Sequence, residues 1–338
     1  MLPLPFVEQD YSDLYGLVAA PIRARLLTVG LELGVFDHLD EFRDLSELSA
    51  AIRSHPGNTE LFLDALAAIG VVEKKEGRYR NTEQTMRFLM RRSPVYLGDL
   101  LLMITHRCAD SLGDLPKLVL GGPQRDPVCD GSSEATWAEA ARVSAAWVTG
   151  GVGQTMAAVL ADLPEFPRFQ KMLDLGGGHG MFALYFTAAH PSMTGVVFDR
   201  PAVVAAAEEF IREYAAQDRL SVQAGDYLHD DIGTGYDLVW ACSTLNFARH
   251  DLDTLIGKVF AALNPGGVFA SFQDGLTHER TRPDIMLGHL GEAMRLGRDV
   301  FFSQGEIAAS MLRCGFRHVH SRTVETPMGP MDLDVARK

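Results

Sequence analysis

The sequence predicts an α/β protein in which a largely helical N-terminal part precedes a doubly wound sheet of buried parallel strands. Three observations predict this fold. Apolar residues recur at helical spacing through the first half of the chain, short apolar runs alternate with helical stretches after Pro167, and a glycine-rich turn follows the first of these runs. The two halves meet near residues 161–170.

The N-terminal residues predict a winged helix, that is, three helices followed by a hairpin. Apolar residues at helical spacing place the helices at 22–39, 44–52 and 58–69. The first is expected to stop around Gly34 and Asp37, and Asn58 or Thr59 is the expected capping residue of the third. Two short strand-like pieces on either side of Gly77 predict the hairpin.

Two uses of a winged helix have to be compared. The expected hairpin carries the basic residues Lys74, Lys75, Arg78 and Arg80, which a DNA-reading module would use. Glu73 and Glu76 are interleaved with them, however, and the chain has a formal net charge of -13. Because binding to a nucleic-acid backbone depends on clustered Lys and Arg, we favour a structural, dimer-forming use and expect no nucleic-acid partner.

The middle of the chain predicts long helices. They are expected over 97–106 and 135–160, and the Gly/Pro-rich segment 121–127 separates them. The chain is therefore expected to have three parts: a winged helix at 1–95, a helical linker and substrate-pocket region at 96–165, and the doubly wound domain at 166–338.

Five short apolar runs predict the strands of the sheet, at 171–174, 194–199, 220–223, 236–240 and 267–271. The first run ends in Asp174, and the turn Gly176-Gly-Gly-His-Gly180 and a helix follow it. Glycines permit a sharp turn and a close approach of the backbone to a ligand, and the helix start presents free N–H groups. This order predicts a nucleotide site, although Gly178-x-Gly180-x-x-Ala183 alone also fits a dinucleotide fingerprint.

Three further features separate this site from that of a nicotinamide dehydrogenase. Asp199 ends the second strand, where a carboxylate can accept both hydroxyls of a ribose. The segment Gly225-Asp226-Tyr227 follows the third strand, where an acid and an aromatic ring can meet an adenine. The segment Leu263-Asn-Pro-Gly-Gly267 then turns into a late strand. A nicotinamide dehydrogenase has no reason to carry the whole series in this order.

Composition adds expectations about class and location. Hydrophobic residues make up 47% and charged residues 22% of the chain, as in soluble globular proteins. The four cysteines share no CxxC spacing, which predicts neither a metal site nor a disulfide framework. The N-terminus lacks the features of a signal peptide, and no apolar run approaches the length that crosses a bilayer. We expect a cytoplasmic protein without a metal or a membrane partner.

Over essentially its whole length the chain resembles the small-molecule O-methyltransferases of plants and bacteria, of the caffeate and hydroxyindole type. The matching stretches are Leu31-Glu-Leu-Gly-Val-Phe36, Leu66-Ala-Ala-Ile-Gly-Val-Val72 with Gly77-Arg-Tyr-Arg, Asp174-Leu-Gly-Gly-Gly-His-Gly180, Asp199-Arg-Pro201, Gly225-Asp-Tyr227 and Asn264-Pro-Gly-Gly267. The resemblance implies a homodimer with a winged-helix dimerisation domain before a Rossmann-like methyltransferase domain, whose seven-stranded sheet is mostly parallel. It also implies S-adenosyl-L-methionine as cofactor and S-adenosyl-L-homocysteine as product.

The resemblance also implies which residues hold the cofactor. Gly176 and Gly178 would contact the methionine moiety, Asp199 the ribose and Asp226 the adenine. The full set of implied cofactor residues is Asp174, Gly176, Gly178, Asp199, Arg200, Gly225, Asp226, Tyr227 and Cys242.

The chain departs from the family at the catalytic base. Members that methylate phenols carry Leu-His-x-Trp-x-Asp after the fourth strand, and the His removes the phenolic proton. Here the segment reads Thr244-Leu-Asn-Phe-Ala-Arg-His-Asp251, so Asn246 occupies the base position, and an amide takes no proton at neutral pH. The acidic position late in the fifth strand is Gln273, with Asp274 next to it.

Three accounts of this departure stay open. His289, on an expected helix over 284–296, could act as the base, as in the bacteriochlorophyllide C-20 methyltransferase branch, which this chain resembles around Asn246 and His289; a packed core histidine is the alternative interpretation. An acidic acceptor could arrive deprotonated, so that proximity suffices. The enzyme could also carry out other chemistry on the same scaffold.

The sequence thus leads to one main hypothesis and two alternatives. The main hypothesis is methyl transfer from S-adenosylmethionine to a small aromatic or ring-containing metabolite, with O-methylation favoured over C- or S-methylation and with His289 and Asn246 as candidate catalytic residues. The alternatives are a non-methylating enzyme and a winged-helix regulator that senses S-adenosylmethionine.

Overall fold

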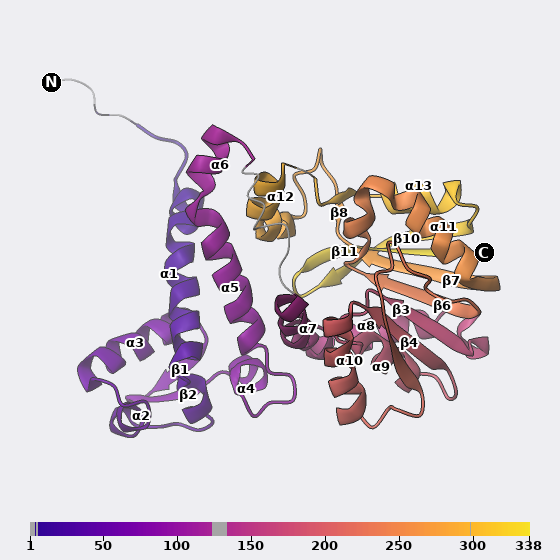
Figure 1. The fold of residues 1–338 in the computed structure, drawn as a ribbon. Coiled ribbons are helices and arrows are strands. Elements are labelled where there is room, and N and C mark those ends of the chain that lie inside the picture. Colours follow the sequence, from indigo (N-terminus) through magenta and orange to yellow (C-terminus); the bar gives the residue numbers. More distant parts are fainter. Residues whose placement is uncertain (1–3, 5, 124–133, 298) are drawn as a thin grey trace. The chain divides into compact units, whose positions relative to one another are not determined.

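The computed structural model describes residue 4 and residues 6–123, 134–297 and 299–338. The chain divides into two compact units, Met1–His106 and Arg107–Lys338. Figure 1 shows the helices and strands of both units.

The first unit is the predicted winged helix. Its elements are α1 (Ser12–Glu32), the short 3-10 helix η1 (Val35–His38), α2 (Leu45–Ala51), α3 (Pro56–Ala68), the hairpin β1 (Val72–Lys75) and β2 (Arg78–Asn81), α4 (Glu83–Leu89) and the first part of α5 (Gly98–Gly113). The prediction of three helices and a hairpin is confirmed. Helix α2 begins with a capping box, in which the Asp44 and Glu47 side chains each accept from the other residue's backbone N–H.

Two boundaries of this unit differ from the prediction. Helix α1 begins ten residues before the predicted start at Ile22 and ends at Glu32, because Gly34 takes a left-handed conformation with φ 66°. Helix α3 begins at Pro56, and the His55 side chain accepts from the Asn58 N–H at 3.4 Å. His55 is therefore the cap, where Asn58 or Thr59 was expected, since a proline suits the first helical position.

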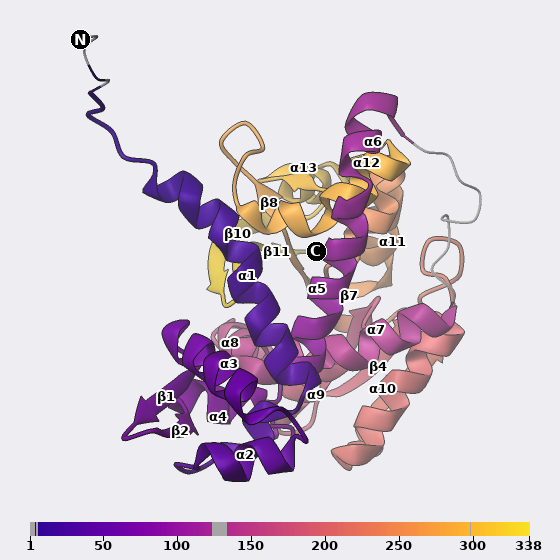
Figure 2. The ribbon, with the colours of Figure 1, turned by 90° about the vertical axis from the view of Figure 1, so that its left-hand side faces the viewer.

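The N-terminal half of α1 is apolar and uncovered within its unit. Leu14, Leu17, Val18 and Ile22 are 67%, 72%, 73% and 64% exposed. Figures 1 and 2 show this half of α1 extending away from α2, α3 and the hairpin. The core of the unit lies at the other end of α1, where Leu31 packs with residues of η1, α2, α3 and the hairpin.

Two helices are longer and more apolar than was expected from the sequence. Two helical stretches, Ser12–Glu32 and Glu134–Ala161, are long and apolar enough to cross a bilayer by length and composition alone. The expectation that no segment reaches this length is wrong, because the few polar residues that interrupt the apolar runs leave the mean hydropathy at 1.3 and 1.2. Core helices of soluble proteins pass the same test, so the result assigns no membrane role.

The second unit is built on a seven-stranded sheet with the order β10-β11-β7-β6-β3-β4-β5. Its strands are β3 (Lys171–Leu175), β4 (Thr194–Asp199), β5 (Leu220–Ala224), β6 (Tyr236–Cys242), β7 (Leu263–Gln273), β10 (Arg317–Thr326) and β11 (Gly329–Arg337). Strands β5, β4, β3, β6 and β7 are parallel, and β11 and β10 are antiparallel to their neighbours. The mostly parallel seven-stranded sheet is confirmed; β10 and β11 were not found from the sequence.

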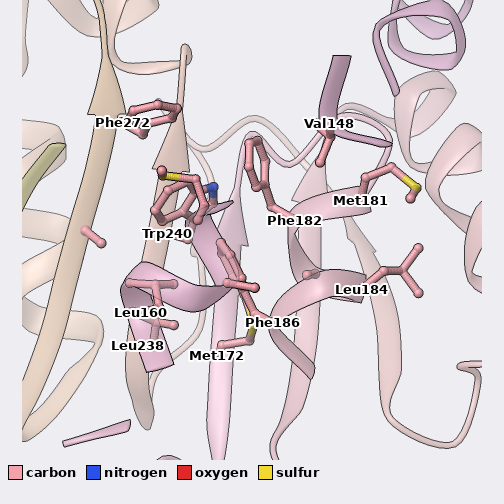
Figure 3. Close-up of a cluster of buried hydrophobic side chains, with 14 of the residues drawn as sticks. Val148, Leu160, Met172, Met181, Phe182, Leu184, Phe186, Leu238, Trp240 and Phe272 are labelled. Carbon is pink, nitrogen blue, oxygen red and sulfur yellow. The ribbon is translucent and has the colours of Figure 1, made fainter. Parts of the chain in front are cut away.

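Helices cover both faces of this sheet. The remaining elements are α6 (Leu115–Gly121), α7 (Glu134–Trp147), the π-helical segment η3 (Val148–Val152), α8 (Gly153–Ala161), η4 (Phe166–Arg168), α9 (Met181–Ala188), α10 (Pro201–Glu213), η5 (Leu245–Asp251), α11 (Leu252–Ala262), β8 (Gly275–Leu276), η6 (Asp284–His289), α12 (Leu290–Leu296), β9 (Phe302–Ser303) and α13 (Glu306–Arg313). Residues of α8, α9 and α10 form one buried cluster against the sheet, and residues of α11 and α13 form the other. Figure 3 shows the first cluster, in which Phe182 and Phe186 lie beside Trp240.

Two predicted helical features are modified. The helix expected over 135–160 is interrupted at η3, where Gly151 has φ 133°. The Gly/Pro-rich break begins at the end of α6, and its residues from 124 onward lie outside the described part of the chain.

Candidate cofactor and acceptor site

The glycine-rich turn leaves the carboxyl end of β3 and leads into α9. Gly176, Gly178 and Gly180 all have positive φ, of 64°, 54° and 69°. At Gly176 the space is also closed, because an added Cβ would lie 2.1 Å from the Thr244 Oγ1. The sequence places glycine here because the turn needs both a left-handed backbone and a close approach to the end of β6.

Asp199 is joined to this turn by hydrogen bonds. Its Oδ2 accepts from the Gly178 N–H at 2.8 Å, and its Oδ1 accepts from the Arg200 N–H at 2.7 Å. Burial raises the pKa of Asp199, whereas the two amide hydrogen bonds act to lower it. Each carboxylate oxygen can accept one more hydrogen bond, which leaves both free for the ribose hydroxyls predicted from the sequence. The hydrogen bond from Gly178 also places this carboxylate next to the glycine turn.

Asp174 and His179 are buried within the turn region. Asp174 is 1% exposed and its Oδ2 has no hydrogen-bond partner. Burial, together with the nearby Asp199 charge, raises the pKa of Asp174 to about 7, although the Ala183 amide acts to lower it. Burial lowers the pKa of His179 to about 4, so its imidazole is neutral near pH 7, and its Nδ1 accepts from the Met181 N–H at 3.0 Å. An unpartnered buried carboxylate beside an open glycine turn fits the cationic part of S-adenosylmethionine.

The loop after β5 carries the residues assigned to the adenine. Asp226 is half-exposed, and its Oδ1 accepts from the Leu228 N–H at 2.9 Å. Tyr227 is only 9% exposed, and its hydroxyl lies 2.7 Å from the Thr244 Oγ1. Its buried ring therefore ties this loop to the end of β6. Gly225 is required because a Cβ there would lie 2.6 Å from the Phe198 ring.

Lys258 on α11 supports the same loop, a role that was not predicted from the sequence. Its ammonium group donates to the backbone carbonyls of Tyr227, Leu228 and Asp230, at 2.8, 3.3 and 2.9 Å. The spacing of residues in an amphipathic helix does not distinguish a lysine that supports a loop from a lysine that points into solvent. Its role depends on which loop the helix packs against.

Arg200 and Cys242 complete the predicted set. Arg200 precedes α10, and its guanidinium carbon lies 5.9 Å from the centre of the Trp137 ring. Cys242 ends β6 opposite Phe272 of β7. Burial raises the pKa of the Cys242 thiol far above its usual range, so the thiol stays protonated and is no nucleophile.

The candidate catalytic residues lie on two different segments. Asn246 is in η5, and its buried Oδ1 has no hydrogen-bond partner. His289 is the last residue of η6, just before α12, so the helix predicted over 284–296 is present but divides there into a 3-10 and an α-helical segment. Its side chain is 43% exposed and its Nδ1 lies 3.7 Å from the Glu292 Oε2. The alternative of a packed core histidine is therefore wrong.

Asp274 lies close enough to His289 for their charges to interact. Burial raises the pKa of Asp274, the His289 charge acts to lower it, and the Asp332 charge acts to raise it. The ring of Phe301 lies 6.0 Å from that of His289, edge to face. Two carboxylates thus lie near His289, Glu292 on its own segment and Asp274 after β7.

A network of ion pairs fixes the segment that carries Asn246. Arg249 of η5 is only 16% exposed and binds Asp299 at 3.0 Å and Glu306 at 2.9 Å. Arg280 binds the same Asp299 at 2.7 Å. Within the described residues, no group of three His, Cys, Asp or Glu side chains is arranged to hold a metal ion.

Comparison with known proteins agrees with this geometry. A model of the O-methyltransferase domain matches residues 143–279, and a model of the O-methyltransferase dimerisation domain matches residues 18–91. The chain belongs to the O-methyltransferase family. The resemblance seen in the sequence is thereby confirmed, together with S-adenosylmethionine as the cofactor.

Relatives and solved structures extend over almost the whole chain. The tetracenomycin polyketide synthesis 8-O-methyl transferase TcmO of Streptomyces glaucescens is 26% identical over 97% of this chain and 96% of its own length. The N,N-dimethyltransferase OxyT of Streptomyces rimosus is 28% identical over the same shares. Human N-acetylserotonin methyltransferase, solved with S-adenosylmethionine, has the same fold, with a TM-score of 0.80 at 23% identity, over 99% of both chains.

Proposed function

We propose that this protein transfers the methyl group of S-adenosylmethionine to an oxygen atom of a small, ring-containing acceptor. The observation that carries the proposal is the pairing of the glycine turn with Asp199, which binds the turn through the Gly178 N–H. In this assignment Gly176 and Gly178 contact the methionine moiety, Asp199 the ribose and Asp226 the adenine. Asp174 faces the positive charge of the cofactor, and Arg200, Gly225, Tyr227 and Cys242 shape the surrounding walls.

The acceptor class is supported by what the relatives act on. By name they include a tetracenomycin 8-O-methyl transferase, a 3-hydroxy-5-methyl-1-naphthoate 3-O-methyltransferase and an acetylserotonin O-methyltransferase. These names share an acceptor built on rings. An acceptor of the same type suits a family member that matches them over 72% to 98% of its length.

In the proposed mechanism the protein aligns the acceptor and removes its proton. The bound cofactor supplies a methyl group on a positively charged sulfur, which favours in-line attack by a nearby oxygen. His289 takes the hydroxyl proton, since it is accessible and has Asp274 and Glu292 nearby to stabilise the imidazolium. Asn246 donates or accepts a hydrogen bond but takes no proton, so it orients the acceptor.

We also propose that the protein is a homodimer formed through its N-terminal unit. The dimerisation-domain match covers residues 18–91, and the apolar half of α1 lies uncovered within that unit. Leu17→Glu together with Ile22→Glu is expected to convert a dimer to a monomer in light scattering coupled to size exclusion. Leu112→Glu, at a residue 48% exposed and outside the matched region, is the control that should stay dimeric.

Isothermal titration calorimetry and an acceptor screen test the function. S-adenosylmethionine and S-adenosylhomocysteine are expected to bind with one site per chain. Incubation with a panel of phenols, naphthols, polycyclic hydroxy-ketones and phenols that carry an amino group is expected to release S-adenosylhomocysteine with at least one of them. Cofactor binding without release from any member of the panel would contradict the proposed acceptor class; no binding at all would contradict the whole assignment.

A further inference from the structure

A small cavity lies at the carboxyl end of β7, beside the edge strand pair β11 and β10. Its volume is about 10 Å³, which is room for one group the size of a water molecule or an ammonium group. Its polar walls come from Gln273, Asp274, Ser303, Asp332 and Asp334, and Phe302 and Ile307 contribute apolar surface. Gln273 and Asp332 are direct partners across the β7–β11 register. We call this the acidic cavity.

Two acceptor atoms at the acidic cavity have no donor. Gln273 is 5% exposed and its Oε1 is buried without a hydrogen-bond partner. Asp332 is 8% exposed and its Oδ2 is likewise without a partner, whereas its Oδ1 accepts from the Thr323 Oγ1 at 2.9 Å and the Gln304 Nε2 at 3.1 Å. Buried acceptors are almost always satisfied in folded proteins, so two facing one cavity indicate a donor that enters it.

The cavity also has negative charge that no described cation balances. Within the described residues, Asp274, Asp332 and Asp334 form no ion pair with a lysine or an arginine, and the Ser321 hydroxyl is the hydrogen-bond donor to Asp334. Burial raises the pKa of both Asp274 and Asp334, and the Asp332 charge raises both further. The His289 charge acts on Asp274 but not on Asp334. Buried carboxylates are stable only when a partner charge or donor compensates them.

We propose that the acidic cavity binds a protonated amino group carried by the methyl acceptor. This inference rests on the proposed function and narrows the acceptor class to a ring-containing amine. An ammonium group brings a positive charge and several N–H donors, which match two unpartnered acceptors among three carboxylates. A water molecule would supply donors but no charge. A coordinated metal ion is disfavoured because the described carboxylates do not group as a metal site.

The position of the cavity fits this use. It lies at the carboxyl end of β7, next to β6, whose end leads through Thr244 into η5 with Asn246. The carboxyl ends of parallel strands meet at one edge of the sheet, and the glycine turn leaves β3 at the same edge. An amino group held here therefore keeps the rest of the acceptor at the edge where the cofactor binds.

Matched probes test the inference. The melting temperature is measured with saturating S-adenosylhomocysteine and increasing 2-phenylethylammonium or 2-phenylethanol, which differ only in the ammonium and hydroxyl groups. The amine is expected to bind about tenfold or more tightly than the alcohol, as expected for charged rather than neutral hydrogen bonds. Equal shifts with the two probes, or no shift with either, would overturn the proposal.

Two variants separate the cavity from general effects of charge. Asp332→Asn keeps an oxygen for Thr323 and Gln304 but removes the charge, so the preference for the amine is expected to disappear. The free variant is also expected to melt at a higher temperature, because a buried like charge is gone. Asp218→Asn, which removes an exposed carboxylate, is expected to behave like the unaltered protein.

Calorimetry with S-adenosylhomocysteine on the same variants distinguishes a failure of the proposed amine site from a failure of the proposed cofactor site. If all bind it and Asp332→Asn alone loses the amine preference, the inference is supported. If all bind it and Asp332→Asn keeps the preference, the acidic cavity is not the amine site, while the proposed function stands. If the unaltered protein fails to bind it, the proposed function fails first.

Discussion

The two halves of the central sheet differ in how closely they follow the family. On the β3, β4 and β5 side, the glycine turn, Asp199 and the Gly225–Tyr227 loop keep the expected residues, and hydrogen bonds join Asp199 to the turn. On the β6, β7 and β11 side, Asn246 and Gln273 stand where a base and an acid were expected, and both have an unpartnered buried oxygen. The half proposed to hold the cofactor thus keeps the residues that the family predicts, whereas the half proposed to face the acceptor carries different ones.

The largest expected effect comes from breaking the cofactor half at Asp199. Asp199→Ala removes the two proposed ribose contacts and the hydrogen bond from the Gly178 N–H, and charged hydrogen bonds contribute about 1.5–3 kcal/mol each. We expect S-adenosylmethionine to bind about a hundredfold or more weakly in calorimetry. Asp218→Ala is the control, and unchanged affinity in Asp199→Ala would remove the basis for the cofactor assignment.

Asp174 and His179, both buried in the turn region, are expected to change the stability of the protein with pH in opposite directions. The pKa of Asp174 is raised to about 7, so its stabilising contribution is full at low pH and is lost as the pH rises through about 7. The pKa of His179 is lowered to about 4, so its contribution is full near neutral pH and is lost as the pH falls toward 4. The two slopes oppose each other between about pH 4 and 6.5.

Single substitutions are expected to reveal each slope. In Asp174→Asn the free energy of unfolding of the cofactor-free protein, taken as the difference from the unaltered protein, should rise with pH between pH 5 and 6.5, because the opposing slope of Asp174 is removed. In His179→Asn it should fall over the same range, by an amount on the order of a few kcal/mol over the full titration. Urea unfolding at several pH values measures both. Parallel curves for the three proteins would contradict the assigned directions.

On the acceptor half, His289→Ala tests the base. Loss of a general base lowers the rate by about a hundredfold or more. We expect that decrease in kcat with an acceptor from the screen, and loss of the acidic limb of the pH–rate profile. His289→Gln keeps the volume and should be equally slow. An unchanged kcat in both variants would mean that approximation of an already ionised acceptor is sufficient.

The smallest effect is expected at Asn246. Asn246→Ala removes a buried oxygen that has no partner in the free protein, so the melting temperature should stay the same or rise slightly. We expect kcat/KM to fall by less than about tenfold, as for the loss of one orienting hydrogen bond. A loss as large as that of His289→Ala would show that the two residues act as a unit.

Much of the fold could be predicted because its signals are local. The five parallel strands and the winged helix follow from apolar spacing and turn residues. Strands β10 and β11 were missed because β10 is largely exposed and because the burial of β11 comes from packing against other elements. The boundary of α3 was misplaced because His55 caps a helix that a proline begins, a choice that spacing alone does not specify.

The residues of the proposed cofactor site could be read along the chain, because the glycine turn follows a buried strand and its left-handed backbone favours glycine. Three other features appear only in the folded chain: the support that Lys258 gives to the loop after β5, the exposure of His289 and the acidic cavity. The first and the last of these join residues far apart in the chain. Such long-range contacts depend on packing between elements, and the spacing of residues along the chain does not record them.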